Sequence, residues 1–159
     1  MIFGAIAIGG GIYWYSKTKM PLTSRFSEQV TGYKRGEVKT TVSEDLKKDA
    51  IEALVATYSP SDGSSSRKNV TFVAVRYPSK ARAELAVQNK VRDMQQGTIS
   101  KATITEAGNK KVKGREVGLR TVLATPVMEQ IVWNENEDFM LVTSVTGGAL
   151  AFEKNLPDQ

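Results

Sequence analysis

The sequence predicts an α+β protein, with a single N-terminal transmembrane helix followed by one domain in which two main helices pack on one face of an antiparallel sheet of about five strands. Three observations support this fold class. Residues 1–15 are almost entirely apolar, the apolar residues of the middle region follow helical spacing, and those after Gly97 follow the period of two that is typical of strands. We therefore divide the chain into a transmembrane anchor (residues 1–20), a juxtamembrane linker (21–40) and a soluble α+β domain (41–159).

The apolar segment at residues 2–15 contains no charge and no proline, which indicates a membrane anchor. At about 1.5 Å per residue it spans about 21 Å, so crossing about 30 Å of hydrocarbon requires the helix to continue to Met20. A cleaved signal peptide is the main alternative, although no basic residue precedes the segment and no small residues end it. The other alternative is that this apolar segment forms part of the core of the soluble domain. We expect these residues to lie at the membrane interface: Tyr13, Trp14, Tyr15, Lys17 and Lys19.

Small residues four positions apart in the anchor favour close packing against a neighbouring transmembrane helix. The residues that would form this partner-helix face are Ala5, Ala7, Gly9, Gly10 and Gly11. The alternative, of equal weight, is that a short anchor simply tolerates glycine. Lysine and arginine flank the segment only on its carboxyl side, which predicts a single-pass protein with its N-terminus outside and its domain in the cytoplasm.

The region from residue 38 to residue 69 predicts a short strand at 38–42, a helix at 44–58 and an exposed loop at 59–69. Thr41 and Glu44 have the spacing of a capping box, which places the helix start. The apolar residues that follow recur at helical spacing, and they are Leu46, Ala50, Ala53, Leu54 and Tyr58.

The remaining chain predicts a central strand, a helix and a four-stranded meander. Residues 70–77 are apolar on both faces, as in a strand that is covered on each side. Residues 79–96 form a helix whose buried stripe is Ala83, Val87, Val91 and Met94, while Leu85 points elsewhere. Alternation then predicts strands at 99–106, 115–125, 127–134 and 138–146, and a short helix at 149–155.

Composition excludes several functional classes. The chain has no cysteine and no histidine, which removes thiolate nucleophiles, serine–histidine triads and the common zinc and haem sites. We therefore expect no cofactor and no metal. The net charge of +5 is concentrated in the first forty residues, where six cations face two carboxylates. That excess is expected beside a membrane, so we do not expect a nucleic-acid partner.

Three groups of polar residues are candidate sites. Lys110, Lys111, Lys113 and Arg115 form a cationic turn that could contact acidic headgroups or an acidic partner, although lysines also protect hairpins from edge pairing. A calcium loop at Asn134, Asn136 and Asp138 is rejected, because valine at 145 replaces the required bidentate carboxylate. That segment is better explained as an acidic hairpin turn.

The third group is Arg120 and Glu129, which lie on strands that we expect to be neighbours and are predicted to pair across the sheet. The pair is more consistent with a solvent-facing contact than with a catalytic carboxylate, since no second acid can be placed beside Glu129.

These observations favour a non-catalytic accessory or assembly subunit of a larger membrane protein complex, for which photosynthetic and respiratory complexes are natural hosts. Its partners would be other membrane subunits and the bilayer. The alternative is a membrane-tethered ligand-binding or sensory module with a cavity lined by Phe72, Trp133 and Phe139. An enzyme is not expected, because it would require two clustered acids in a cleft.

Overall fold

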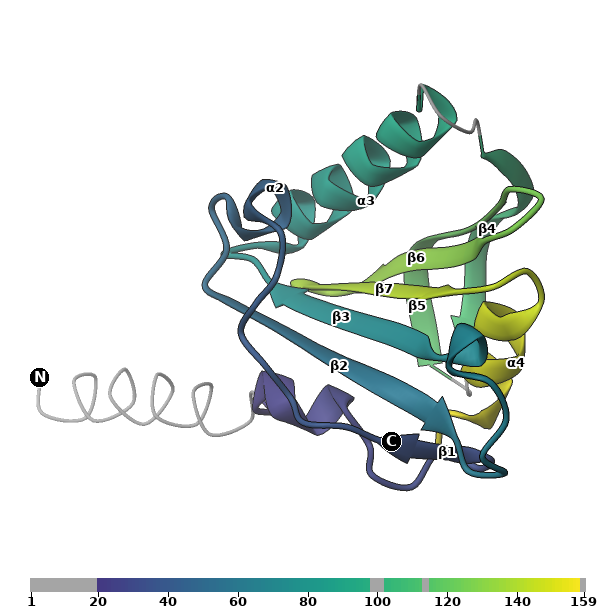
Figure 1. Ribbon diagram of the computed structural model, residues 1–159. Coiled ribbons are helices and arrows are strands. Elements are labelled where there is room, and N and C mark those ends of the chain that lie inside the picture. Colours follow the sequence, from purple (N-terminus) through teal and green to yellow (C-terminus); the bar gives the residue numbers. More distant parts are fainter. Residues whose placement is uncertain (1–19, 98–101, 113–114, 158–159) are drawn as a thin grey trace, which may run out of the picture.

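The computed structural model describes residues 20–97, 102–112 and 115–157, which form one seven-stranded antiparallel sheet and three α-helices (Figure 1). The strand order is β1-β2-β3-β7-β6-β5-β4. The strands are β1 (Tyr33–Arg35), β2 (Glu52–Pro60), β3 (Val70–Arg76), β4 (Thr103–Val112), β5 (Arg115–Ala124), β6 (Glu129–Glu135) and β7 (Asp138–Ser144). The helices are α2 (Glu44–Lys47), α3 (Lys80–Gln95) and α4 (Gly148–Asn155), with the 3-10 helices η1 (Leu22–Arg25) and η2 (Ser66–Lys68).

The second half of the chain agrees with the predicted order of elements. The apolar segment is β3, a central strand between β2 and β7, and the meander is β4 to β7. Helix α3 begins after Ser79, whose hydroxyl accepts a hydrogen bond from the Arg82 backbone N–H at 3.3 Å. Of its predicted buried stripe, Ala83 and Val87 are buried and Val91 and Met94 are partly buried against the same core, while Leu85 is 44% exposed as expected.

The predicted helix at 44–58 is wrong. Helix α2 ends at Lys47, Asp49 adopts a positive φ of 63°, and the chain then enters β2. Strand β2 pairs with β3 over seven residues, so the hydrogen bonds of the sheet override the helical spacing of its apolar residues. The strand expected at 38–42 is only an isolated bridge between Lys39 and Val55, and the short edge strand β1 precedes it. The sheet therefore has seven strands rather than about five.

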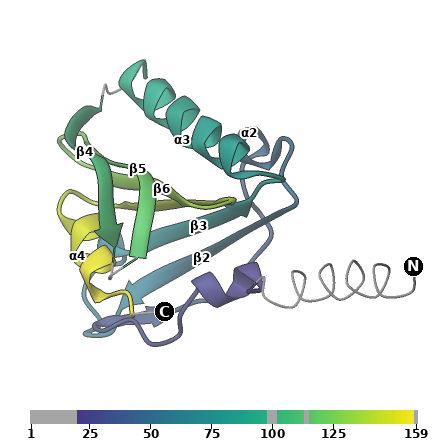
Figure 2. The ribbon, with the colours of Figure 1, turned by 180° about the vertical axis from the view of Figure 1, so that it is seen from behind.

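Of the two main helices expected on one face of the sheet only α3 is present, and the short helix α4 lies on the opposite face, as Figures 1 and 2 show. Helix α3 packs against β5, β6 and β7. The core on this face includes apolar sheet residues such as Val75 and Phe139. Helix α4 and η1 cover the other face, where Phe72, Trp133 and Phe152 are at most 2% exposed. We call these the α3 face and the α4 face.

The predicted fold class is also corrected on its transmembrane helix, since no helix among the described residues is long and apolar enough to cross a membrane. Except for Met20, the anchor at residues 1–20 lies outside the described residues. Within residues 21–40, Leu22, Phe26 and Val30 are at most 3% exposed and belong to the core of the α4 face. The domain core therefore begins immediately after Pro21.

Candidate functional site

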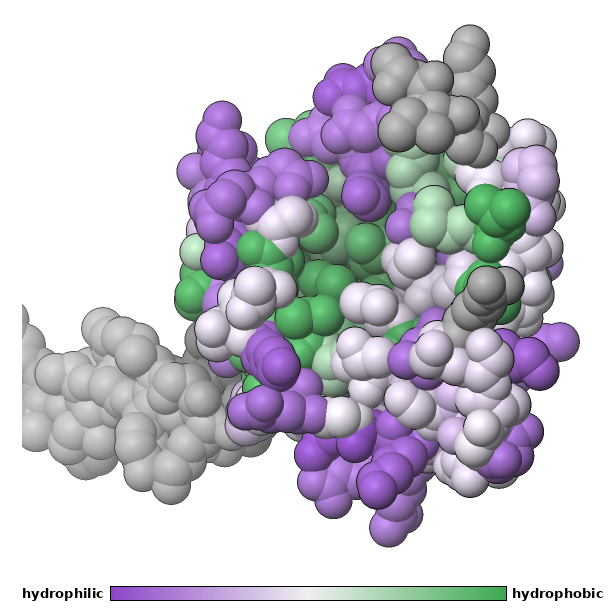
Figure 3. All heavy atoms as spheres, viewed as in Figure 1, coloured by the Kyte–Doolittle hydropathy of each residue, from purple (hydrophilic) through white to green (hydrophobic). Residues whose placement is uncertain are grey.

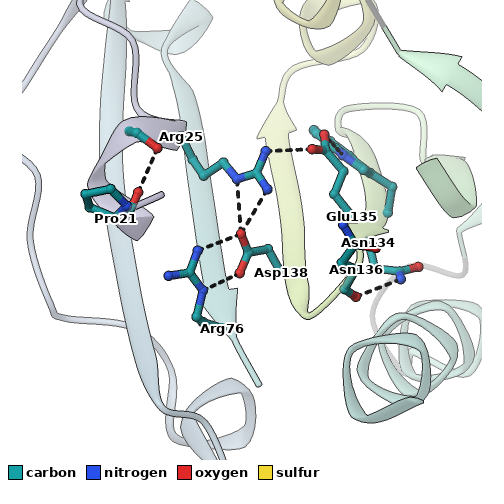
Figure 4. Close-up of polar contacts among 9 residues, drawn as sticks. Pro21, Arg25, Arg76, Asn134, Glu135, Asn136 and Asp138 are labelled. Atoms are coloured by element: carbon teal, nitrogen blue, oxygen red, sulfur yellow. Dashed lines mark hydrogen bonds and ion pairs between the residues drawn. The ribbon is translucent and has the colours of Figure 1, made fainter. Parts of the chain in front are cut away.

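Four charged side chains meet where the N-terminal part of the described chain joins the sheet, and we call them the Arg25 cluster: Arg25, Arg76, Glu135 and Asp138 (Figure 4). Arg25 is the last residue of η1, and the other three come from the ends of β3, β6 and β7. Strand register aligns them, since Asp138 faces Arg76 on one neighbour and Glu135 on the other. Sheet pairing thus places the two carboxylates side by side, and Arg25 of η1 binds both of them.

Asp138 is the centre of the Arg25 cluster. Its carboxylate accepts bonds from Arg25 Nε and Nη2 at 3.1 and 2.9 Å, and from Arg76 Nε and Nη2 at 2.7 and 2.9 Å. Arg25 Nη1 also donates to Glu135 Oε2 at 2.6 Å. The Trp133 indole N–H donates to the other oxygen of Glu135 at 3.4 Å. Two cations and two carboxylates thus satisfy one another.

Burial makes the Arg25 cluster a structural clamp. The side chains of Glu135 and Asp138 are 8% and 5% exposed, and those of Arg25 and Arg76 are 17% and 13% exposed. The hydrogen bonds that Arg76 donates to Asp138 raise the pKa of Arg76 above its ordinary value, although burial opposes this effect. Because each carboxylate is already held by guanidinium groups, neither is poised as a general acid or base.

The other buried carboxylates are also engaged in structural contacts. Arg120 does not pair with Glu129, which corrects the cross-strand prediction. It donates from Nε and Nη2 to Glu153 of α4 at 2.7 and 2.6 Å, and from Nη1 to Glu106 of β4 at 2.7 Å. Bonding to Glu153 raises the pKa of Arg120 further above its ordinary value. Glu129 instead accepts the Leu150 backbone N–H at 2.9 Å, which caps the first turn of α4.

The predicted cationic turn lies at the β4–β5 hairpin, where Lys111 pairs in register with Glu116 and Val112 with Arg115. Lys110 is also in β4, whereas Lys113 lies outside the described residues. The predicted partner-helix and membrane-interface residues also lie outside them, and these are Ala5, Ala7, Gly9, Gly10, Gly11, Tyr13, Trp14, Tyr15, Lys17 and Lys19. Their roles stay predictions.

The acidic hairpin turn joins β6 to β7 through Asn136 and Glu137. Asn136 has a positive φ of 51°, which asparagine tolerates in tight turns. Asn134 is fully buried and donates to the Asn136 carbonyl at 3.2 Å, while Asp138 belongs to the Arg25 cluster. Asp138 is therefore engaged by arginines, while the buried Oδ1 of Asn134 has no hydrogen-bond partner among the described residues. Within the described residues, no group of three or more acidic side chains is arranged to hold a metal ion.

The aromatic residues predicted to line one cavity lie on both sides of the sheet. Phe72 and Trp133 stack on the α4 face with ring centroids 6.2 Å apart, and both are 2% exposed. Phe139 is fully buried on the α3 face. A cavity lined by all three is therefore impossible, because the backbone of the sheet separates them.

An apolar hollow does open on the α3 face, below α3 in the view of Figure 3. Helix α3 covers β5 to β7. Over β2, the same face is covered, among the described residues, only by the short segment that contains α2. Val55, Val73 and Leu141 form a row across β2, β3 and β7. Val55 is only partly buried.

Sequence reasoning missed the Arg25 cluster because its members are distant in the chain. One signal was present: Leu22, Phe26 and Val30 recur every four residues within a polar segment, as buried positions do. Neither Arg25 nor Asp138 carries any local mark of its partner. Comparison of the chain with protein families, curated proteins and solved structures finds no match.

Proposed function

We propose that this chain is a non-catalytic accessory or assembly subunit of a larger membrane complex. The observation that carries the proposal is the Arg25 cluster, which fixes the chain to the sheet only five residues after Met20. Leu22 and Phe26 are buried on either side of this contact. A segment bound by other subunits would therefore hold the domain in a fixed orientation.

The use of the buried acids supports a bracing role over a catalytic one. Asp138 and Glu135 hold Arg25, Glu153 holds Arg120, and Glu129 caps α4. Catalytic carboxylates need an accessible oxygen beside a substrate, whereas each of these contacts an element of the fold. These contacts hold η1 and α4 against the sheet.

Site-specific photo-crosslinking in native membranes tests the proposal. A photoreactive residue at Ala7, within the segment predicted to contact other subunits, should form one discrete protein adduct. The same residue at Gln88, which is exposed on α3, serves as the matched position on the domain. Labelling of lipid alone from Ala7, or a smear of unrelated proteins, would contradict the proposal.

A ligand-binding module is the second candidate, and the apolar hollow of Figure 3 is the observation that favours it. It would bind an apolar ligand on the α3 face, beside the partly buried Val55 of β2. A fluorescent fatty-acid probe should then bind the wild-type chain and lose affinity for the Val55→Arg variant. Val127→Arg is the matched control, because Val127 is 74% exposed in the β5–β6 turn. Equal probe binding by both variants would exclude this function.

A further inference from the structure

The described chain enters the fold almost without a spacer. Leu22 is fully buried and Phe26 is 2% exposed, although residues 21–40 were expected to form a linker. Arg25 is held between them by two carboxylates of the sheet, at 2.6 and 2.9 Å. Only Pro21 separates Met20 from the first buried residue, and two extended residues reach at most about 7 Å. The domain therefore cannot turn freely about the segment that precedes it.

The end of the sheet at which the chain enters is identified by the contacts of Arg76. Its guanidinium shares one oxygen of Asp138 with Arg25 of η1. Its carbonyl accepts the backbone N–H of Ile51, just before β2, at 2.8 Å. The start of β2, the end of β3 and the β6–β7 turn therefore lie beside η1, and Figure 1 shows η1 and the start of β2 on the same side of the molecule. We call this the entry end of the sheet.

The entry end exposes two large apolar side chains. Met20 presents 56% of its surface and Ile51 presents 63%. The opposite end exposes Val127 of the β5–β6 turn at 74%, so exposure alone does not distinguish the two ends. The covalent connection does, because the apolar segment at residues 2–15 is joined to the domain at the entry end, through Met20. Strand β6 runs from one end to the other, and its seven residues separate the ends by about 20 Å.

The charges around Ile51 indicate what kind of contact the entry end can make. From residue 44 to residue 52 the chain carries four carboxylates and two lysines, a net charge of −2, and these residues are Glu44, Asp45, Lys47, Lys48, Asp49 and Glu52. Acidic lipid headgroups would repel this charge rather than attract it. The Ile51 side chain, in contrast, gains free energy on entering the boundary between headgroups and acyl chains. A contact at the entry end is therefore apolar.

We propose that the entry end of the sheet rests on the surface of a lipid bilayer, with Ile51 inserted at the headgroup boundary. This inference rests on the proposed function, which holds the segment before Met20 within a membrane complex. Because that segment keeps the domain beside the bilayer, even a weak apolar contact is occupied. The two can nevertheless fail separately. A chain that forms the photo-adduct from Ala7 but lacks the Ile51 contact refutes only the contact, and a chain that makes the contact but forms no adduct refutes only the role in the complex.

Fluorescence quenching by lipid tests the contact on the full chain. The chain contains no cysteine, so Glu52→Cys and Val127→Cys each attach a fluorophore at one exposed position, beside Ile51 or at the opposite end. Each labelled chain is reconstituted into phosphatidylcholine vesicles that carry a nitroxide on the headgroups of both leaflets. We expect quenching at position 52 to be at least about threefold stronger than at position 127, because about 20 Å separates the two ends. Equal quenching at both positions, or stronger quenching at 127, would overturn the proposal.

Two further changes separate the apolar side chain from the short connection, and circular dichroism verifies that each variant is folded. Ile51→Asp should lower the quenching at position 52, whereas the matched change Val127→Asp should leave it as it was. An insertion of about twelve glycine and serine residues between Met20 and Pro21 spans about 20 Å and should bring the two positions to similar quenching. Unchanged quenching in a folded Ile51→Asp chain would refute the role of Ile51, and an insertion without effect would refute the role of the short connection. Stronger quenching at position 52 after addition of phosphatidylserine would overturn the apolar nature of the contact.

Discussion

Replacing Asp138 with asparagine should destabilise the domain more than any exposed charge change. The substitution keeps the size of the side chain but removes the charge that receives four bonds from Arg25 and Arg76. Removing one partner of a fully buried ion pair costs about 3–5 kcal/mol. Because the two arginine side chains are 17% and 13% exposed, water compensates part of this loss. We therefore expect the free energy of unfolding to fall by about 2–4 kcal/mol.

Urea and thermal unfolding of the full chain, followed by circular dichroism, measure this effect. For a chain of 159 residues, a loss of about 3 kcal/mol lowers the midpoint temperature by about 6–12 °C. Glu37→Gln is the matched control, because Glu37 pairs with Lys39 at 3.8 Å and its side chain is 79% exposed. This control should change stability by less than about 0.5 kcal/mol.

A double-mutant cycle tests the mechanism behind that loss. If Asp138 acts through Arg25, then Arg25→Met should cost less in the Asp138→Asn background than in the wild type. The coupling between the two changes should exceed about 1 kcal/mol. An Asp138→Asn variant as stable as the Glu37→Gln control, or a cycle with additive effects, would refute the assignment of the cluster as a clamp.

Three further changes follow from individual contacts, and urea unfolding measures each of them. Gly148→Ala should cost about 1–3 kcal/mol, because the new Cβ would collide with Ser144 Oγ and lie 2.9 Å from Ser144 Cβ, and full stability in this variant would contradict the packing. Glu129→Gln should cost about 1 kcal/mol through weaker capping of α4, and a larger effect at high salt than at low salt would argue against it. Burial raises the pKa of Tyr58 and of Tyr77 to about 12, above about 10 in the unfolded chain. Their contribution is complete below pH 10 and is lost as the pH rises toward 12, by up to about 2–3 kcal/mol for each tyrosine, so stability that stays constant across this range would contradict their burial.

Much of the fold could be predicted because local pattern and tertiary structure agree in the second half of the chain. Strand β3 is apolar on both faces because helices and loops cover both, and α3 buries one stripe. The first half conflicts with its own pattern. In β2, Leu54, Ala56 and Tyr58 alternate toward the α4 face, yet Leu54 and Tyr58 also stand four residues apart as in a helix. The pairing of β2 with β3 decides in favour of the strand, and this pairing cannot be read from the local sequence of β2.

The candidate site was less predictable than the fold because its contacts join distant residues. Arg25 and Asp138 are 113 positions apart, and Arg120 and Glu153 are 33 apart. Arg120 and Glu129 were expected to pair because their strands are neighbours, but the hairpin register places Glu129 opposite Ala124, four residues along the strand from Arg120. Strand adjacency alone does not fix which residues face each other. The partner of a buried charge therefore becomes evident only when the topology is known.

The size of the native particle that contains this chain is the most direct test of the proposed function. Membranes are extracted with mild detergent, and the extract is separated by size under native conditions without crosslinking. The account predicts that the chain migrates with a larger assembly, at a constant ratio to the same partner proteins through a second purification step. Migration of all the chain as an isolated monomer would contradict the account.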